Sequence, residues 1–157
     1  MQKQPNSRYC FLCGVENPIG LKVAFYGDDD DRVVVRFVPR DEHQGYPGVM
    51  HGGLLCALLD ETIGRTLVRR DLWAMTVELN VRFLKPVPVG QELTVIGEVQ
   101  RLRSRTLEGK GEVRLADGTL AVSAEAKYIL LSPEQTDRFR DELGFWQVVP
   151  DDASGQE

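Results

Sequence analysis

A single long helical pattern among strand-like segments constrains the fold of this chain more than any other feature. The helical pattern covers residues 51–70, where leucines at positions 54, 55, 58 and 59 make most of the circumference apolar. A helix that is apolar on most sides must be surrounded by protein. Arg69 and Arg70 close the segment, as the helix dipole favours.

The rest of the chain has the pattern of strands and turns. Residues 21–26 and 32–38 flank Gly27 and four aspartates, which predicts a hairpin with a solvated turn. Four later segments alternate apolar and polar residues and predict a meander: residues 76–83, 93–99, 107–115 and 120–130. Helices do not alternate with strands, so a doubly wound parallel sheet is excluded. The predicted fold class is α+β, with a curved antiparallel sheet wrapped around one long central α-helix.

The length of the chain allows one domain with short extensions. A chain of 157 residues can bury one core without disulfides or a structural metal. We expect an irregular segment with a CxxC pair over residues 1–20, the folded domain over residues 21–131, and a short helix with an acidic tail over residues 132–157. Ser132 and Pro133 supply the N-cap and the first position of that short helix.

Composition argues against several classes of function. The net charge of −5 gives no electrostatic support for nucleic-acid binding. No apolar run approaches the roughly 20 residues of a membrane span, and the polar N-terminus lacks the apolar stretch of a signal peptide. With three cysteines, an odd number, we expect a reducing, cytoplasmic location without a disulfide framework. Neither nucleic acid nor a membrane is an expected partner.

Asp60 is the candidate functional carboxylate of the helix. It shares one helical stripe with Gly53, Cys56, Ala57 and Gly64, and these four residues are small. A ligand or another backbone can therefore approach Asp60 closely, and burial would prime the carboxylate as a base. The alternative is a structural carboxylate that a buried hydroxyl or arginine binds.

Glu61 is the neighbouring carboxylate, about 100° further around the helix. Arg65 follows it by four residues, in the order that favours an ion pair. The spacing predicts a surface ion pair for Glu61 and leaves Asp60 as the residue with a chemical role.

The residues His51, Gly52 and Gly53 open the helix. The first N–H groups of a helix have no partners inside it, and glycine lets a carbonyl oxygen approach closely, so this entrance suits a polarised carbonyl or an oxyanion. Asp60 lies eight residues after Gly52, about 12 Å along the helix axis, and cannot reach a carbonyl held there. Two such helices packed antiparallel about a two-fold axis would bring the two groups together. The spacing predicts a site shared between two subunits.

Three segments of the chain resemble one family. The segment Gly48-Val-Met-His-Gly-Gly-Leu-Leu-Cys-Ala-Leu-Leu-Asp60 resembles the helix motif of the hotdog-fold acyl-CoA thioesterases, the PaaI-like group. Residues 76–86 resemble the strand that follows this helix in the family, and residues 10–21 resemble an N-terminal segment of one subgroup. The resemblance implies a hotdog fold, a homodimer or homotetramer, and hydrolysis of an acyl-CoA substrate.

The resemblance also implies roles for individual residues. Asp60 matches the catalytic carboxylate, which acts as nucleophile or as base for water, and Gly52 matches the glycine whose N–H polarises the thioester carbonyl. His51 matches an orienting histidine, and Thr76 matches a hydroxyl residue that helps to place the water. Many relatives have asparagine six residues before the histidine, where this chain has Gly45.

Two further residues of the entrance are candidates for substrate binding. Gln44 lies beside Gly45 and could replace the missing amide side chain. Gly53 adds a second N–H group at the start of the helix.

The candidates for binding the rest of the substrate lie on either side of the predicted strands. Trp73 and Met75 could line an acyl pocket, although core packing explains them equally well. Arg101 and Arg103 could bind the phosphates of CoA, or could simply keep an exposed hairpin soluble.

Cys10 and Cys13 form a CxxC pair with three possible interpretations. Zinc would need about four ligands, so His43 or the cysteines of a symmetry mate would have to complete the site. A redox pair would favour a helix start near a βαβ unit, which the pattern lacks. Burial of two thiols is the favoured interpretation, and no metal or cofactor is expected.

The predicted function is hydrolysis of an acyl-CoA thioester. The alternative within the same fold is an enoyl-thioester hydratase or dehydratase, for which His51 and Asp60 could supply an acid and a base. The alternative from another class is a non-catalytic acyl-CoA-binding dimer, which the glycine at position 45 motivates.

Overall fold

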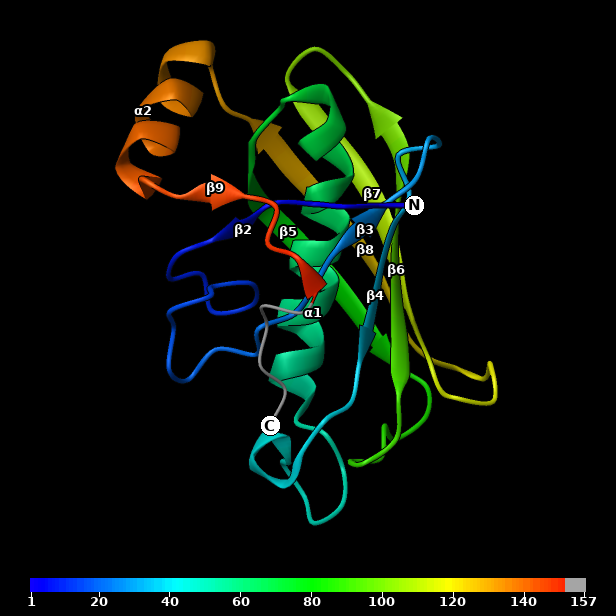
Figure 1. Cartoon of the computed structure of the whole chain (residues 1–157). Coiled ribbons are helices and arrows are strands. Elements are labelled where there is room, and N and C mark those ends of the chain that lie inside the picture. The colour runs from blue at the N-terminus through cyan, green and yellow to red at the C-terminus, as the bar shows by residue number, and fades with distance from the viewer. Residues whose placement is uncertain (152–157) are drawn as a thin grey trace.

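The computed structural model describes residues 1–151 and contains a curved antiparallel sheet around one central helix (Figure 1). The predicted α+β class is confirmed. Helix α1 spans Gly52–Gly64, and α2 spans Pro133–Leu143. The strands are β1 (Gln2–Lys3), β2 (Asn6–Ser7), β3 (Tyr26–Gly27), β4 (Val33–Phe37), β5 (Ala74–Phe83), β6 (Leu93–Leu102), β7 (Thr106–Arg114), β8 (Leu120–Leu130) and β9 (Trp146–Gln147).

The central helix ends earlier than predicted. α1 stops at Gly64, and a 3-10 helix, η2 (Arg65–Arg70), continues to a left-handed residue at Asp71. Gly64 has a low helix propensity, and Thr66 Oγ1 donates a hydrogen bond to a main-chain oxygen of the preceding turn, so its side chain competes with the helical ladder. The prediction of one α-helix over residues 51–70 is therefore wrong in its last six residues.

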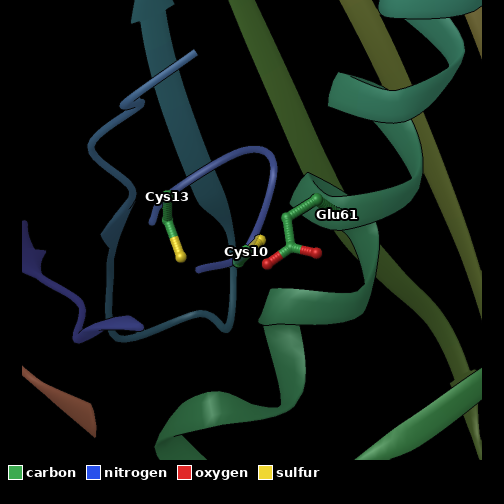
Figure 2. Close-up of side chains that lie close together, drawn as sticks. All are labelled: Cys10, Cys13 and Glu61. Atoms are coloured by element: carbon green, nitrogen blue, oxygen red, sulfur yellow. The ribbon is translucent and has the colours of Figure 1, made fainter. Parts of the chain in front are cut away.

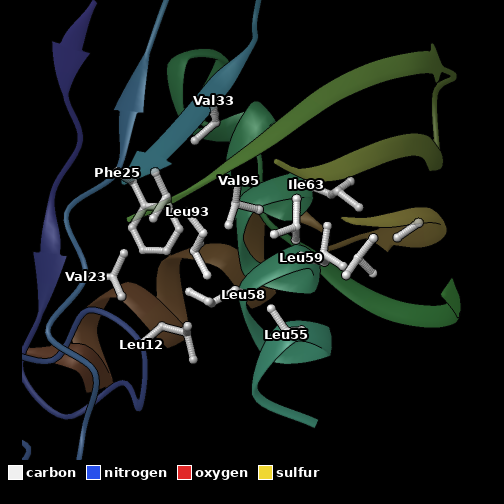
Figure 3. Packing of buried hydrophobic residues seen from close by; sticks show 14 of the residues in the cluster. Leu12, Val23, Phe25, Val33, Leu55, Leu58, Leu59, Ile63, Leu93 and Val95 are labelled. Atoms are coloured by element: carbon white, nitrogen blue, oxygen red, sulfur yellow. The ribbon is translucent and has the colours of Figure 1, made fainter. Parts of the chain in front are cut away.

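One face of α1 packs closely against the sheet, as Figure 3 shows for the surrounding core. Glycines on β6 and β7 make the approach possible: a Cβ at Gly97 would lie 2.6 Å from Thr62 O. The buried residues of the helix are Leu55, Leu58, Leu59, Thr62 and Ile63. The small-residue stripe lies on another face and is not fully buried in the single chain; it comprises Gly53, Cys56, Ala57, Asp60 and Gly64.

The order of strands differs from the predicted meander. The seven-stranded sheet has the order β1-β3-β4-β6-β7-β8-β5, so β5 pairs with β8 and lies at one edge. Only β6, β7 and β8 form a meander, because the connection after β5 passes the positions of β8 and β7 before β6 begins. Alternation identifies strands but carries no information about which strand pairs with which.

The predicted first hairpin is shorter than residues 21–38. β3 and β4 pair antiparallel, but residues 21–23 bind the N-terminal segment instead of extending β3. Leu21 N–H donates to Phe11 O at 2.9 Å, and Val23 N–H donates to Leu12 O at 2.7 Å. The N-terminal segment is thereby held against the core.

The two ends of the described chain meet beside the sheet. β2 pairs antiparallel with β9, a strand that the sequence pattern did not predict. The predicted short helix is confirmed as α2, with Ser132 as its N-cap in a capping box with Gln135. The predicted acidic tail lies mostly outside the described residues.

Candidate functional site

A cavity of about 240 Å³ lies between α1, β5, β8 and the two ends of the chain. Asp60, Thr76 and Trp73 from the sequence candidates line it, whereas Gly52 does not. The other lining residues are Ser7, Cys10, Cys13, Glu61, Gly64, Arg65, Val68, Leu72, Ala74, Tyr128, Leu143 and Trp146. The candidate carboxylate therefore faces a partly apolar space that β2, β9 and α2 help to enclose.

Two hydroxyl groups bind the Asp60 carboxylate. Thr76 Oγ1 on β5 donates to Asp60 Oδ1 at 2.8 Å, and Tyr128 OH on β8 lies 3.0 Å from the same oxygen. Tyr128 OH also lies 2.9 Å from Asp60 O. Burial, followed by the charge of Asp60, raises the pKa of Tyr128, so the phenol stays protonated as a donor. Within residues 1–151, the side chains that donate to this carboxylate are these two hydroxyls, and no lysine or arginine forms an ion pair with it.

Tyr128 is a site residue that the sequence analysis missed. It occupies an inward position of the alternating strand β8, and the sequence pattern therefore predicts only a core-packing role for its ring. The available signal was its hydroxyl, because a buried tyrosine OH needs a hydrogen-bond partner and Asp60 was the free acceptor on the facing helix.

His51 forms the N-cap of α1. Its Nδ1 accepts a hydrogen bond from Gly53 N–H at 2.9 Å, so that N–H group is already used inside the chain. Within residues 1–151, Gly52 N–H donates no hydrogen bond. A Cβ at Gly52 would lie 3.3 Å from the Phe83 ring, so the entrance is narrow on that side. The entrance therefore offers one free backbone donor, at Gly52.

Gln44 and Gly45 lie next to this entrance. Gln44 Oε1 accepts from Gly48 N–H at 3.1 Å, which ties its side chain into the loop before the helix. Gly45 N–H donates to Val49 O at 2.9 Å, and a Cβ at position 45 would lie 3.3 Å from His51 Cδ2. The loop is thus folded against the N-cap histidine.

The remaining candidates lie further away. Met75 is 57% exposed and does not line the cavity. Arg101 and Arg103 lie at the hairpin between β6 and β7 and are exposed. The strand pattern alone could not distinguish Trp73, which lines the cavity, from Met75, which faces outward.

Glu61 lies in a different environment from Asp60. Arg65 Nε donates to Glu61 Oε1 at 2.8 Å, and Arg65 Nη2 donates to Cys13 Sγ at 2.9 Å. The predicted ion pair is present, but Arg65 is only 4% exposed, so it is not a surface pair. The guanidinium also stacks on Phe25, with its Cζ 4.2 Å from the ring centroid.

Cys10, Cys13 and Glu61 form a group that we call the Cys–Glu cluster (Figure 2). The hydrogen bond from Cys10 and the charge of Arg65 lower the pKa of Cys13, against the opposing effect of burial. The same hydrogen bond and burial raise the pKa of Cys10. Glu61 was not among the predicted partners of the cysteines, because only the fold brings α1 against the N-terminal loop.

Among the described residues, none of the helices is long and apolar enough to cross a membrane.

A curved antiparallel sheet wrapped around one central helix is the hotdog fold. In this chain the helix begins after His51 and carries a carboxylate at Asp60. A sequence model of the Thioesterase superfamily matches residues 47–122, which include both features. The chain belongs to this superfamily.

Two curated relatives illustrate the similarity. Acyl-coenzyme A thioesterase THEM4 of Mus musculus is 30% identical over 136 residues, which cover 85% of this chain and 59% of the relative. A candidate esterase of Saccharolobus solfataricus is 31% identical over 113 residues, which cover 71% of this chain and 80% of the relative. The chain spans about three-fifths of the length of the THEM4 relative.

Solved structures share the fold. The thioesterase superfamily protein RHA08564 superimposes with a TM-score of 0.73 at 30% identity, over 77% of this chain and 63% of that chain. The PaaI protein of E. coli, from the phenylacetic acid degradation operon, has a TM-score of 0.67 at 20% identity, over 71% of this chain and 81% of that chain.

Proposed function

We propose that this chain hydrolyses an acyl-CoA thioester at a site built from Asp60 and the entrance of α1. The observation that carries the proposal is the Asp60 carboxylate, which two hydroxyls position at the wall of an open cavity. The family, and relatives named as acyl-coenzyme A thioesterases, support the reaction class.

Asp60 supplies the attacking group. Both hydroxyl donors bind Oδ1, and Oδ2 accepts no hydrogen bond from the described residues. Oδ2 can therefore take a proton from water or attack the acyl carbon directly. As a base, Asp60 lets water add to the carbonyl carbon, and the C–S bond then breaks. As a nucleophile, it displaces CoA thiol and forms an acyl–aspartyl anhydride, which water hydrolyses to regenerate the carboxylate. Both routes yield a carboxylic acid and CoA thiol.

Gly52 supplies the group that polarises the carbonyl. Its N–H is unpaired within residues 1–151 and lies at the positive end of the helix dipole. A donor placed there stabilises the negative charge that develops on the carbonyl oxygen in the transition state. His51 Nδ1 accepts from Gly53 N–H and so leaves Gly52 N–H as the donor for the carbonyl.

A second copy of the chain completes the site. Asp60 and Gly52 are about 12 Å apart along one helix, so one copy cannot apply both to the same carbonyl. The edge strand β5 carries three apolar side chains that are more than half exposed: Met75 57%, Val77 56% and Phe83 55%. An exposed apolar edge strand is a template for strand pairing, and the small-residue stripe lets two antiparallel helices approach.

The first experiment measures CoA release from aryl-, short-, medium- and long-chain acyl-CoAs. We expect Asp60→Asn to lower kcat/KM at least about 100-fold, equivalent to roughly 2.7 kcal/mol of barrier. Asp117→Asn is the matched control, because it makes the same change in the turn between β7 and β8. Full activity in Asp60→Asn would contradict the proposal, and hydration of an enoyl-CoA without CoA release would support a hydratase.

A complementation experiment tests the sharing of the site. Gly52→Pro removes the N–H donor at a helical position where proline is tolerated, and His51 before it already has extended backbone angles. Its ring atoms also approach Phe83, a contact that the Gly52→Ala control tests separately. We expect Gly52→Pro and Asp60→Asn to be inactive separately. Mixed subunits should regain about a quarter of the wild-type activity, because half of the random dimers hold one intact site.

The control in that experiment is Gly52→Ala, which keeps the N–H group. No recovery of activity in verified mixed dimers would show that Asp60 and Gly52 act within one copy.

A further inference from the structure

The structure assigns a binding site for a thiophilic divalent metal ion, such as Zn²⁺, to the Cys–Glu cluster. We propose that Cys10 Sγ, Cys13 Sγ and a carboxylate oxygen of Glu61 are its ligands. The three ligand atoms lie within 4.8 Å of one another (Figure 2). The inference does not depend on the proposed hydrolysis, because none of these residues carries the reaction there.

The chemistry and spacing of the cluster suit zinc. Thiolate sulfur and carboxylate oxygen are both zinc ligands, at about 2.3 Å and 2.0–2.2 Å. Tetrahedral bonds of these lengths place ligand atoms roughly 3.5–3.8 Å apart, so a movement of about 1 Å closes the cluster around an ion. Side-chain rotation alone can supply a movement of this size.

The cysteine loop is already arranged for ligation. Leu12 N–H donates to Cys10 Sγ at 3.3 Å, and Ser7 N–H donates to Cys13 Sγ at 3.4 Å. Backbone donors of this kind stabilise a sulfur that carries negative charge. The loop closes through Gly14 N–H and Cys10 O at 2.8 Å, where a Cβ on Gly14 would lie 2.4 Å from the same oxygen. A glycine is therefore required directly after the second cysteine.

The charges around the cluster favour a divalent cation. Metal binding removes the protons of both thiols, so the three ligands together carry three negative charges. Arg65 contributes one positive charge beside Cys13 and Glu61, and a divalent ion contributes two. The buried group is then neutral. Arg65 lies behind the ligands and holds both of them by hydrogen bonds, as groups around metal ligands commonly do.

The cavity supplies the entry path and the fourth coordination position. All three ligands line the same cavity as Asp60, although Cys13 is only 1% exposed. A water or another small ligand in the cavity can complete four-coordinate geometry. The metal would fasten the N-terminal loop to α1 and thereby fix one wall of the cavity.

The test uses the full-length protein, reduced with a non-thiol reductant and stripped of metal with a chelator. Co²⁺ is added as a spectroscopic probe, and we expect one equivalent to produce thiolate-to-cobalt charge-transfer absorption in the near ultraviolet. Zn²⁺ should abolish that absorption by competition. A wild-type protein that shows no such band overturns the proposal without any variant.

Single substitutions then identify the ligands. We expect Cys10→Ser and Cys13→Ser to weaken Co²⁺ binding at least about 100-fold, and Glu61→Gln about 10-fold, since each removes one anionic ligand. Cys56→Ser is the matched control, because Cys56 lies on α1 outside the cluster and should leave the affinity within about 2-fold. Loss of the band in Cys56→Ser, or its retention in Cys10→Ser, overturns the ligand assignment.

Thiol counting separates metal binding from redox chemistry. Zn²⁺ should protect two of the three thiols from alkylation in the folded protein. If Zn²⁺ protects none, and peroxide instead converts Cys10 and Cys13 to a disulfide with release of water, the cluster is a redox pair and the metal proposal fails.

Discussion

Asp60 and Glu61 are neighbours on α1, yet their carboxylates have different kinds of hydrogen-bond partner. Asp60 receives two hydrogen bonds from neutral hydroxyls, whereas Glu61 is bound by the guanidinium of Arg65. A hydroxyl fixes the position of a carboxylate and leaves its charge in place. A guanidinium fixes the position and neutralises the charge.

Of the two adjacent carboxylates, only Asp60 is without a cationic partner among the described residues, so Asp60 is the one available for chemistry. The Asp60 side is supported by β5 and β8, two long paired strands with one register shift after Thr76. The Glu61 side is supported by the irregular N-terminal loop through Arg65, which also binds Pro5 O at 2.8 Å. We therefore expect changes on the Asp60 side to affect activity and changes on the Glu61 side to affect stability.

The largest expected effect is the loss of Arg65. Arg65→Met leaves Glu61 without its cation and removes the bonds that hold the N-terminal loop, and should destabilise the protein by about 3 kcal/mol. Urea unfolding followed by circular dichroism measures the effect. Arg36→Met on the exposed side of β4 is the control and should change the free energy of unfolding by less than about 0.5 kcal/mol.

The same unfolding measurement on Asp60→Asn tests whether Asp60, unlike Glu61, has no structural role. We expect that variant to remain within about 1 kcal/mol of wild type, because the hydroxyl donors can bind an amide oxygen. A loss as large as that of Arg65→Met would mean that both carboxylates are structural.

The next effect concerns the hydroxyls that hold Asp60. Tyr128→Phe and Thr76→Val each remove one donor to Oδ1 and should lower kcat/KM about 10-fold, with the thermal midpoint nearly unchanged. Thr106→Val, at the exposed start of β7, is the control. Equal activity in all three variants would show that the position of the carboxylate does not limit the reaction.

The smallest expected effect is on the pH dependence of stability. It concerns His43, which lies behind the helix entrance. Burial, and then the charge of Arg40, lowers the pKa of His43, whose Nδ1 accepts from Arg40 N–H at 2.9 Å. The folded state favours the neutral ring, so its stabilisation is present above the unfolded pKa of about 6.5 and is lost as pH falls.

His43→Asn tests this pH dependence, because it keeps a side-chain acceptor but does not titrate. Between pH 7.5 and pH 5.5, the thermal midpoint of wild type should fall further than that of the variant. Parallel curves for the two proteins would show that His43 contributes no pH dependence.

The sequence predicted the features that depend on local pattern. The period of the leucines located α1, and alternation located β5 to β8. These predictions hold because burial on one face imposes a period on the residues of a helix or strand.

The features that the sequence did not predict depend on contacts between distant segments. Tyr128 meets Asp60 across 68 residues, and Arg65 meets Cys13 across 52. The pairing of β5 with β8 also involves no local signal. Residue spacing could place Glu61 beside Arg65, but it could not show that a loop would bury the pair.

The pairing of β2 with β9 has a consequence for how the protein folds. Its partners, Ser7 with Trp146 and Asn6 with Gln147, join opposite ends of the chain. The closure of so long a loop is entropically costly and yields only two residue pairs, so this contact should form last and open first. Since both ends wall the cavity that Asp60 faces, brief local unfolding there would widen the cavity while the sheet stays intact. Hydrogen exchange at residues 6–7 and 146–147 should therefore be faster than at α1.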